Sequence, residues 1–224
     1  MHQRLLTVIL LVGLFFGLFT LAAGMSSWRL PDNQQGYAPV QPIEYSHRLH
    51  AGELEIDCKF CHSAAEHSRH AGIPSSDVCM KCHKYVVVSP DVQRAEDERA
   101  AKEAKENPDK KIVAEKKVSA ELQRLYKSLD LDENREPKPN AVPKSIPWVR
   151  VHNLPDYVYF DHSAHVSAGV DCEKCHGPVK SMQRVRQVED LSMGWCVNCH
   201  RDAAKNGIDG RQVNAPTNCA VCHY

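Results

Sequence analysis

The longest uninterrupted apolar stretch lies at the start of the chain. Residues 5–25 contain no charged side chain over 21 positions, between Arg4 and Arg29. As an α-helix this stretch is about 31 Å long, close to the hydrocarbon thickness of a bilayer, which is about 30 Å. We therefore expect one transmembrane helix within residues 1–29. A cleaved signal peptide is the alternative, because small residues at 22–24 could form a cleavage site, but its apolar part is usually only about 7–15 residues long.

Residues 91–138 show the opposite pattern, with 25 charged residues of 48, of which 12 are basic and 13 acidic. Four apolar residues recur there at helical spacing, Leu122, Leu125, Tyr126 and Leu129. Ser119 is a suitable N-cap for that helix, and Pro108 ends an earlier charged helix. We expect a solvated helical insertion that packs one stripe on the rest of the protein, followed by a Pro-rich connector to residue 147. A partner-binding arm is the alternative.

Composition adds two constraints. Lys plus Arg and Asp plus Glu are both 28, so the net charge is zero, and no basic excess points to a nucleic-acid partner. Apolar residues make up 42% and aromatics 7% of the chain, and many of the apolar residues lie in the N-terminal stretch. The rest of the chain is therefore short of core material, and something else must fill its interior. The chain has 10 Cys and 13 His, which point to that material.

All ten cysteines fall in one motif, Cys-x-x-Cys-His, which occurs five times. The cysteines are Cys58 and Cys61, Cys79 and Cys82, Cys172 and Cys175, Cys196 and Cys199, and Cys219 and Cys222. The histidines that follow them are His62, His83, His176, His200 and His223. This is the attachment motif of c-type haem, in which two thiols bond to the vinyl groups and the adjacent His binds the iron. The sequence predicts five covalently bound c-type haems.

Other uses of cysteine fit this pattern poorly. Zinc sites built from paired Cys-x-x-Cys units need an even number of units, and there are five. A disulfide framework does not explain a His after every second Cys, and a thioredoxin-like motif occurs singly in a βαβ context. Because haem is joined to such chains outside the cytoplasm, we expect the haem part on the outer face of the membrane and the N-terminus inside.

Two further pairs of histidines are candidate second axial ligands. His47 and His50 follow Tyr45, and His162 and His165 follow Phe160, each as aromatic-x-His-x-x-His just before a haem motif. Residues i and i+3 of one helical turn share a face but differ in height, so each pair can reach two irons. A surface or zinc-binding pair is the alternative.

This arrangement resembles the small class III multihaem cytochromes. The resemblance implies that the first His of each pair serves the haem that follows and the second serves the next haem. His47 and His50 would then serve the first and second motifs, and His162 and His165 the third and fourth. In similar triple-haem modules, a residue just before the middle motif reaches the last haem, which makes Met193 the candidate for the fifth motif. His152 and His70 are the alternatives, and a lone Met is also common core filling.

The expected fold is mostly α and irregular, with little or no sheet and class III-like haem modules. Its predicted parts are an anchor (1–29), a dihaem module (30–90), the insertion and connector (91–147) and a trihaem module (148–224). Residues 45–83 and 148–223 also resemble the pentahaem cytochrome c subunit of alternative complex III, a bacterial quinol-oxidising respiratory assembly. Segments that carry this resemblance are Gly72 to His83, Trp148 to Val166 and Leu191 to Cys196.

The resemblance implies an electron-transfer subunit that is not itself an enzyme, in the bacterial inner membrane. Its implied partners are polytopic quinol-binding subunits, an iron–sulfur protein and a monohaem cytochrome c, with a soluble carrier or terminal oxidase as further acceptors. A stand-alone membrane-tethered quinol dehydrogenase or electron shuttle is the alternative. A multihaem reductase is disfavoured, because such enzymes need an iron with an open position and every motif here keeps its His.

Overall fold

The computed structural model describes residues 2–26 and 33–224. Within these residues the chain forms short helices joined by long irregular segments, and backbone pairing between strands is limited to isolated bridges. The α-helices are α1 (His2–Ser26), α2 (Cys58–Cys61), α3 (Ser76–His83), α4 (Pro90–Glu106), α5 (Ala120–Ser128), α6 (His162–Ser167), α7 (Cys172–His176), α8 (Met193–Asn206) and α9 (Cys219–Cys222). A π-helical turn, η1 (Arg48–Glu53), and two 3-10 turns, η2 (Ser63–Glu66) and η3 (Val179–Ser181), complete the set. The predicted fold class, mostly helical and irregular without a sheet, is confirmed.

Helix α1 contains the predicted apolar stretch. Residues Gln3–Leu21 have a mean hydropathy of 2.3, and none of this window is buried against the rest of the protein. Its length and composition suit a bilayer span, and an uncleaved signal sequence has the same properties. The helix is therefore confirmed as one apolar element able to cross a membrane.

The charged insertion has the two helices that its pattern predicts. Helix α4 starts with Pro90 in its first turn and ends at Asn107, and Ser119 caps α5 by accepting a hydrogen bond from the backbone N–H of Leu122. On α5, Leu125 and Tyr126 are buried, at 3% and 9% exposed. The apolar stripe therefore packs inward, as expected.

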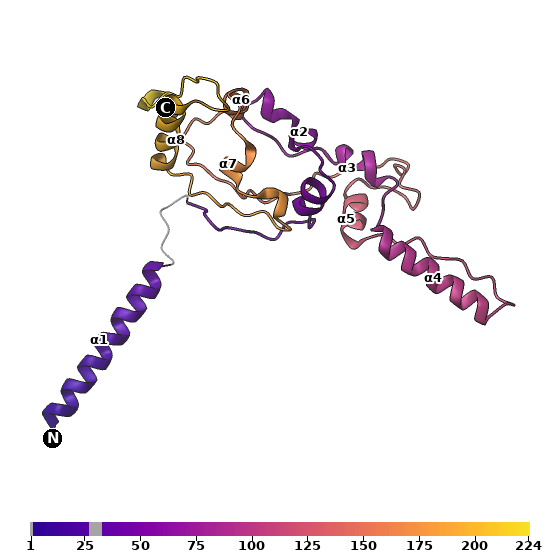
Figure 1. Cartoon of the computed structure of the whole chain (residues 1–224). Coiled ribbons are helices and arrows are strands. Elements are labelled where there is room, and N and C mark those ends of the chain that lie inside the picture. The colour runs from indigo at the N-terminus through magenta and orange to yellow at the C-terminus, as the bar shows by residue number, and fades with distance from the viewer. Residues whose placement is uncertain (1, 27–32) are drawn as a thin grey trace.

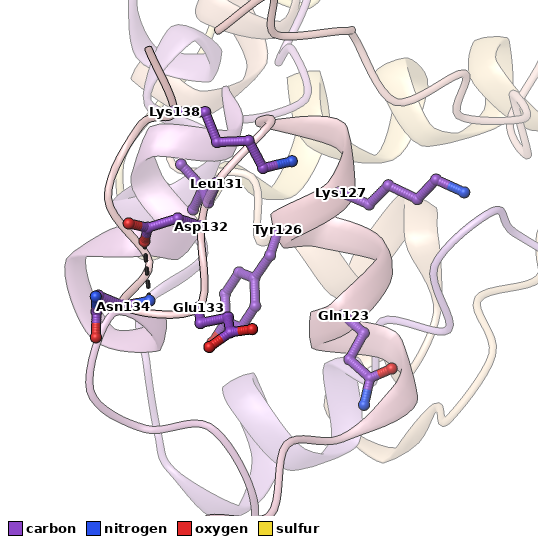
Figure 2. A pocket seen from close by; sticks show the side chains of 8 residues that line it. All are labelled: Gln123, Tyr126, Lys127, Leu131, Asp132, Glu133, Asn134 and Lys138. Carbon is purple, nitrogen blue, oxygen red and sulfur yellow. Dashed lines mark hydrogen bonds between the residues drawn. The ribbon is translucent and has the colours of Figure 1, made fainter.

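The insertion docks on the segment around the second haem motif. The Tyr126 hydroxyl donates to the carbonyl of His83 (2.5 Å), Lys84 pairs with Glu136 (2.6 Å), and the N–H of Ser119 donates to the carbonyl of Val87 (3.0 Å). In Figure 1, α3 and α5 lie side by side, and α4 extends from them away from the end where α8 and the C-terminus lie. One face of α5 and the 131–138 loop also line a cavity of about 630 Å³ that is open to solvent. Figure 2 shows the Tyr126 ring beside the polar side chains that line this cavity.

The predicted dihaem and trihaem modules are in direct contact. Turns η1 and η3 pack together, where the N–H of Arg48 donates to the carbonyl of Met182 (2.9 Å). The backbones approach so closely that a Cβ at Gly52 would overlap the carbonyl oxygen of Lys180, which only glycine avoids. Helix α6 packs on η2 and its following loop, with the N–H of His162 donating to the carbonyl of Arg69 (3.2 Å). The two modules thus interlock through segments about a hundred residues apart in sequence.

The described residues contain little apolar core. Six apolar residues are buried among them: Ala65, Ala100, Leu125, Tyr126, Met182 and Ala203. Three of these belong to the insertion, which leaves two alanines and Met182 for the whole haem-motif part. A polypeptide of this length normally buries far more, so the haem-motif part lacks the side chains to fill its interior.

Candidate haem-binding sites

Each Cys-x-x-Cys-His motif lies on a short helix with a polar residue at its start. Asp57 and Asp171 cap α2 and α7 by accepting from the N–H two residues on, and Ser192 caps α8 by accepting from the N–H of Trp195. The helical turn puts the two thiols, three positions apart, on one face. All ten cysteines are free thiols in the polypeptide. Every motif therefore presents two unpaired thiols on one side of a helical turn, and its histidine follows directly after them.

The first and third motif histidines each face a second, nearly parallel imidazole ring. The ring centres of His47 and His62 are 6.4 Å apart with planes 4° from parallel, and those of His162 and His176 are 6.4 Å apart at 12°. A metal bonded at about 2 Å to one nitrogen of each ring, a typical imidazole bond length, would put the ring centres about 6 Å apart. Both pairs therefore leave a gap that suits one iron with two axial histidines.

The second and fourth motifs repeat this spacing with tilted rings. His50 and His83 have ring centres 6.0 Å apart at 66°, and His165 and His200 have theirs 6.0 Å apart at 44°. Each His-x-x-His segment therefore contributes one ring to a nearly parallel pair and one to a tilted pair, facing two motifs. These four pairs are the ones that the sequence predicted for the first four haems, and the spacing fits haem iron.

The aromatic residue of each segment packs against both of its histidines. Tyr45 meets the edge of His47 at 85° and stacks on His50 at 24°, with ring centres 4.8 and 4.4 Å apart. Phe160 does the same with His162 (4.9 Å, 88°) and His165 (4.5 Å, 26°). The aromatic ring thus fixes the orientation of two candidate ligands at once, and the two segments are near copies of each other.

Hydrogen bonds fix which ring nitrogen of these histidines is free. In six of the nine predicted axial histidines, Nδ1 lies 2.6–2.9 Å from a backbone carbonyl oxygen, which can only accept, so Nδ1 carries the proton. These six are His50, His62, His83, His162, His165 and His200. Such a bond leaves Nε2 unprotonated for a metal and holds the ring in place. Loop carbonyls from Gly72, Val86 and Pro216 supply the acceptors for three motif histidines.

Two of the remaining histidines have other surroundings. Nδ1 of His176 meets Nε2 of His152 at 3.2 Å, and Nδ1 of His47 is buried without a hydrogen-bond partner. Burial lowers the pKa of His176 to about 3 and that of His47 to about 4, with neighbouring histidines lowering both further. Both imidazoles are therefore neutral at physiological pH, as metal ligation requires.

The fifth motif lies against the segment before α6. His223 forms an isolated bridge with Val158, and the N–H of Tyr159 donates to the carbonyl of Cys222 (2.8 Å). The Tyr157 ring lies 5.9 Å from that of His223, at 29°. Met193, the predicted second ligand, is the first residue of α8 and is 69% exposed, so it does not serve as core filling in the described polypeptide. Its ligation of the fifth haem stays a prediction.

Two contacts place the first three motifs next to one another. Burial raises the pKa of the Cys172 thiol, and the nearby Cys58 thiol raises it further. Burial also raises the pKa of the Cys79 thiol, and the nearby Cys61 thiol raises it further. The first motif therefore adjoins both the second and the third.

The row continues through the trihaem part. Burial, with smaller contributions from the nearby thiols of Cys199 and Cys196, raises the pKa of the Cys175 thiol to about 11. Burial likewise raises the pKa of the Cys196 thiol, and the nearby Cys222 thiol raises it further. The third motif therefore adjoins the fourth, and the fourth adjoins the fifth. The spatial order of the motifs is second, first, third, fourth, fifth.

Sequence reasoning missed the outer contacts of these histidines. No periodicity marks the loop carbonyls that orient the rings, because any residue supplies a carbonyl. His152 was considered only as an alternative fifth ligand, and the structure brings it to His176. Its position ten residues before His162, outside any motif, gave no signal for that contact.

Comparison with known proteins agrees with this geometry. Residues 158–224 match the protein family described as cytochrome c7 and related cytochrome c. Together with the fold and the repeated motif, this match shows a cytochrome c7-type multihaem domain in this part of the chain, with covalently bound c-type haems and a role in electron transport. The chain is also 24% identical, over 229 residues, to the menaquinone reductase multihaem cytochrome c subunit of Nitratidesulfovibrio vulgaris (strain Hildenborough). That alignment covers 93% of this chain and 88% of the relative.

Proposed function

We propose that this chain carries five c-type haems in one row and relays electrons within a membrane-bound quinone oxidoreductase complex. The observation that carries the proposal is the continuous order of the five motifs, second, first, third, fourth, fifth, across the molecule. In Figure 1 this row leads from α3, beside the insertion, to α8 and the C-terminus at the other end. A row of sites with two ends suits a relay between two partners.

A bound haem iron would supply a one-electron carrier. The residues of the chain would do the rest. Each cysteine pair would hold one haem by two bonds, and the four histidine pairs would hold the first four irons and leave no place there for a substrate. Backbone carbonyls and the aromatic rings of Tyr45 and Phe160 hold those histidines in one orientation. A rigid ligand set costs little rearrangement when an electron arrives or leaves.

The proposed partners follow from the resemblance to alternative complex III. Quinol-binding polytopic subunits and an iron–sulfur protein would supply electrons, and a monohaem cytochrome c, a soluble carrier or a terminal oxidase would receive them. Helix α1 would anchor the chain in the bacterial inner membrane, with the haem part on the periplasmic face. The similarity to a subunit of a menaquinone reductase supports a membrane complex in general.

Purification from gently solubilised membranes tests this proposal. We expect the mass of the polypeptide plus five haems, an intact N-terminal helix, and co-purification with polytopic membrane subunits. All irons should be low-spin in paramagnetic resonance spectra. A lone protein that reduces its own haems with a quinol analogue would instead indicate a stand-alone quinol dehydrogenase. A high-spin iron in the intact protein would indicate a substrate-binding site.

The direction of electron flow has a second candidate. The relative's name describes a menaquinone reductase, which favours flow toward the quinone and not away from it. Mixing the purified complex with quinol, and separately with quinone after reduction of the haems, distinguishes the two. Fast haem reduction by quinol supports the quinol-oxidising assignment. Fast haem oxidation by quinone, with slow reduction by quinol, supports the reverse.

Substitution of Met193 tests the fifth ligand set. Because thioether ligation raises the potential of a haem, we expect the Met193 haem to have the highest midpoint of the five. Met193→Ala should shift that one midpoint and its spectrum, and Met193→His should lower it. Met182→Leu is the matched control, since Met182 is a buried core methionine, 7% exposed. Unchanged midpoints and spectra in Met193→Ala would remove Met193 from the ligand set.

A further inference from the structure

The third site differs from the others in what its motif histidine contacts. Nδ1 of His176 is 3.2 Å from Nε2 of His152, and the two rings meet edge to face at 80° with centres 4.3 Å apart. The other motif histidines with a recorded Nδ1 bond, His62, His83 and His200, donate to a backbone carbonyl. The third site therefore has a side-chain acceptor where the first, second and fourth have a main-chain carbonyl.

The first site is a natural reference for the third. Both have nearly parallel imidazole pairs with ring centres 6.4 Å apart, and the thiols of Cys58 and Cys172 lie near each other. Their outer contacts differ. At the third site both Nδ1 atoms have an acceptor, whereas at the first site Nδ1 of His47 is buried with none. The two sites thus share their predicted ligands and differ in hydrogen bonding to them.

We infer that His152 is a positioning residue of the third site, whose Nε2 accepts the Nδ1 proton of His176 and lowers the reduction potential of iron bound there. The inference rests on the proposed ligation by His176. An acceptor at Nδ1 makes the imidazole a more basic ligand, which stabilises ferric over ferrous iron. An imidazole nitrogen is also more basic than a peptide carbonyl oxygen. The third site should therefore have a lower potential than the first.

The surroundings of His152 suit an acceptor. Both rings are partly buried, so the surrounding chain shields their contact from solvent. The pair forms part of the contact between the two haem modules, since the His47 and His62 rings lie near His176 as well. The potential difference between the first and third sites would then lie at the junction of the modules. An electron at this junction would favour the first site.

Redox titration of His152 variants tests the inference. His152→Leu removes the acceptor, so we expect one of the five midpoint potentials to rise. The rise should change the reduced-to-oxidised ratio of that haem about tenfold, which corresponds to about 59 mV for a one-electron couple. His152→Gln keeps an acceptor oxygen, so this midpoint should stay close to its wild-type value. The matched control is His67→Leu, because His67 is an exposed histidine outside the paired rings. It should leave all five midpoints unchanged.

The other outcomes have distinct meanings. No shift in His152→Leu, or an equal shift of all five midpoints, overturns the role of His152. Mass spectrometry of the wild-type protein distinguishes failure of this inference from failure of the proposed function. Fewer than five haems would contradict the five-haem relay but not the hydrogen bond between His176 and His152. If His152→Leu does not mature, the reduced wild-type protein decides. In its NMR spectrum, a nitrogen–nitrogen coupling across the His176–His152 hydrogen bond would support the inference. Absence of this coupling, with the signals of both rings resolved, would overturn it.

Discussion

Without haem, the polypeptide should lose the ordered structure of residues 33–90 and 148–224. Their buried apolar residues are Ala65, Met182 and Ala203, too few to offset the conformational entropy of ordering these segments. Five haem rings would supply the missing apolar surface, and the cysteine bonds would fix them to the chain. We expect haem-free protein to show no cooperative thermal transition and to be rapidly digested in these segments.

The insertion provides an internal comparison in the same experiment. Leu125 and Tyr126 on α5 and Ala100 and Glu96 on α4 are buried, and Glu96 accepts hydrogen bonds from Arg99 and from the N–H of Glu115. This part does not depend on haem for its core. Residual helix in the haem-free protein should therefore map to α4 and α5 by hydrogen exchange.

Two routes to the haem-free state control for the thiols themselves. The wild-type sequence produced without the haem-attachment machinery and a variant with all ten cysteines changed to serine should behave alike. Cooperative unfolding of both forms, with protection from exchange in α6 to α9, would contradict haem as the core. Cooperative unfolding of the wild-type form alone would assign the stability to free thiols.

Local sequence features predicted those parts of the fold that depend on neighbours in the chain. The apolar run predicted α1, Pro108 predicted the end of α4, and Ser119 predicted the start of α5. The pairing of His47 with His62 and of His162 with His176 needed the resemblance, because spacing alone permits several partners.

Contacts between distant segments could not be predicted from the sequence. The row of motifs depends on Cys58 lying near Cys172, although these residues are more than a hundred positions apart and nothing in the sequence marks their proximity. The close approach at Gly52 and the hydrogen bond from His176 to His152 are of the same kind. Such contacts arise from packing of irregular segments, and no periodic pattern encodes them.

Deleting the third site should divide the relay into two parts that exchange electrons slowly. In the order second, first, third, fourth, fifth, this site alone adjoins both the first and the fourth. Electron tunnelling slows steeply with the distance between carriers, so a missing central carrier costs more than a missing end carrier. We expect Cys172→Ser with Cys175→Ser to slow redistribution between the two halves by more than one order of magnitude.

The matched control removes an end of the row. Cys219→Ser with Cys222→Ser also deletes one haem, but it leaves the second, first, third and fourth sites contiguous. After a pulse of substoichiometric reductant, the electron should spread over the remaining haems in one fast phase in this control, as in the wild-type protein. The third-site variant should instead show a fast phase within each half and a separate slow phase between them. Equal kinetics in the two variants, with four haems confirmed in each, would mean that another contact bypasses the third site and that the row is wrong.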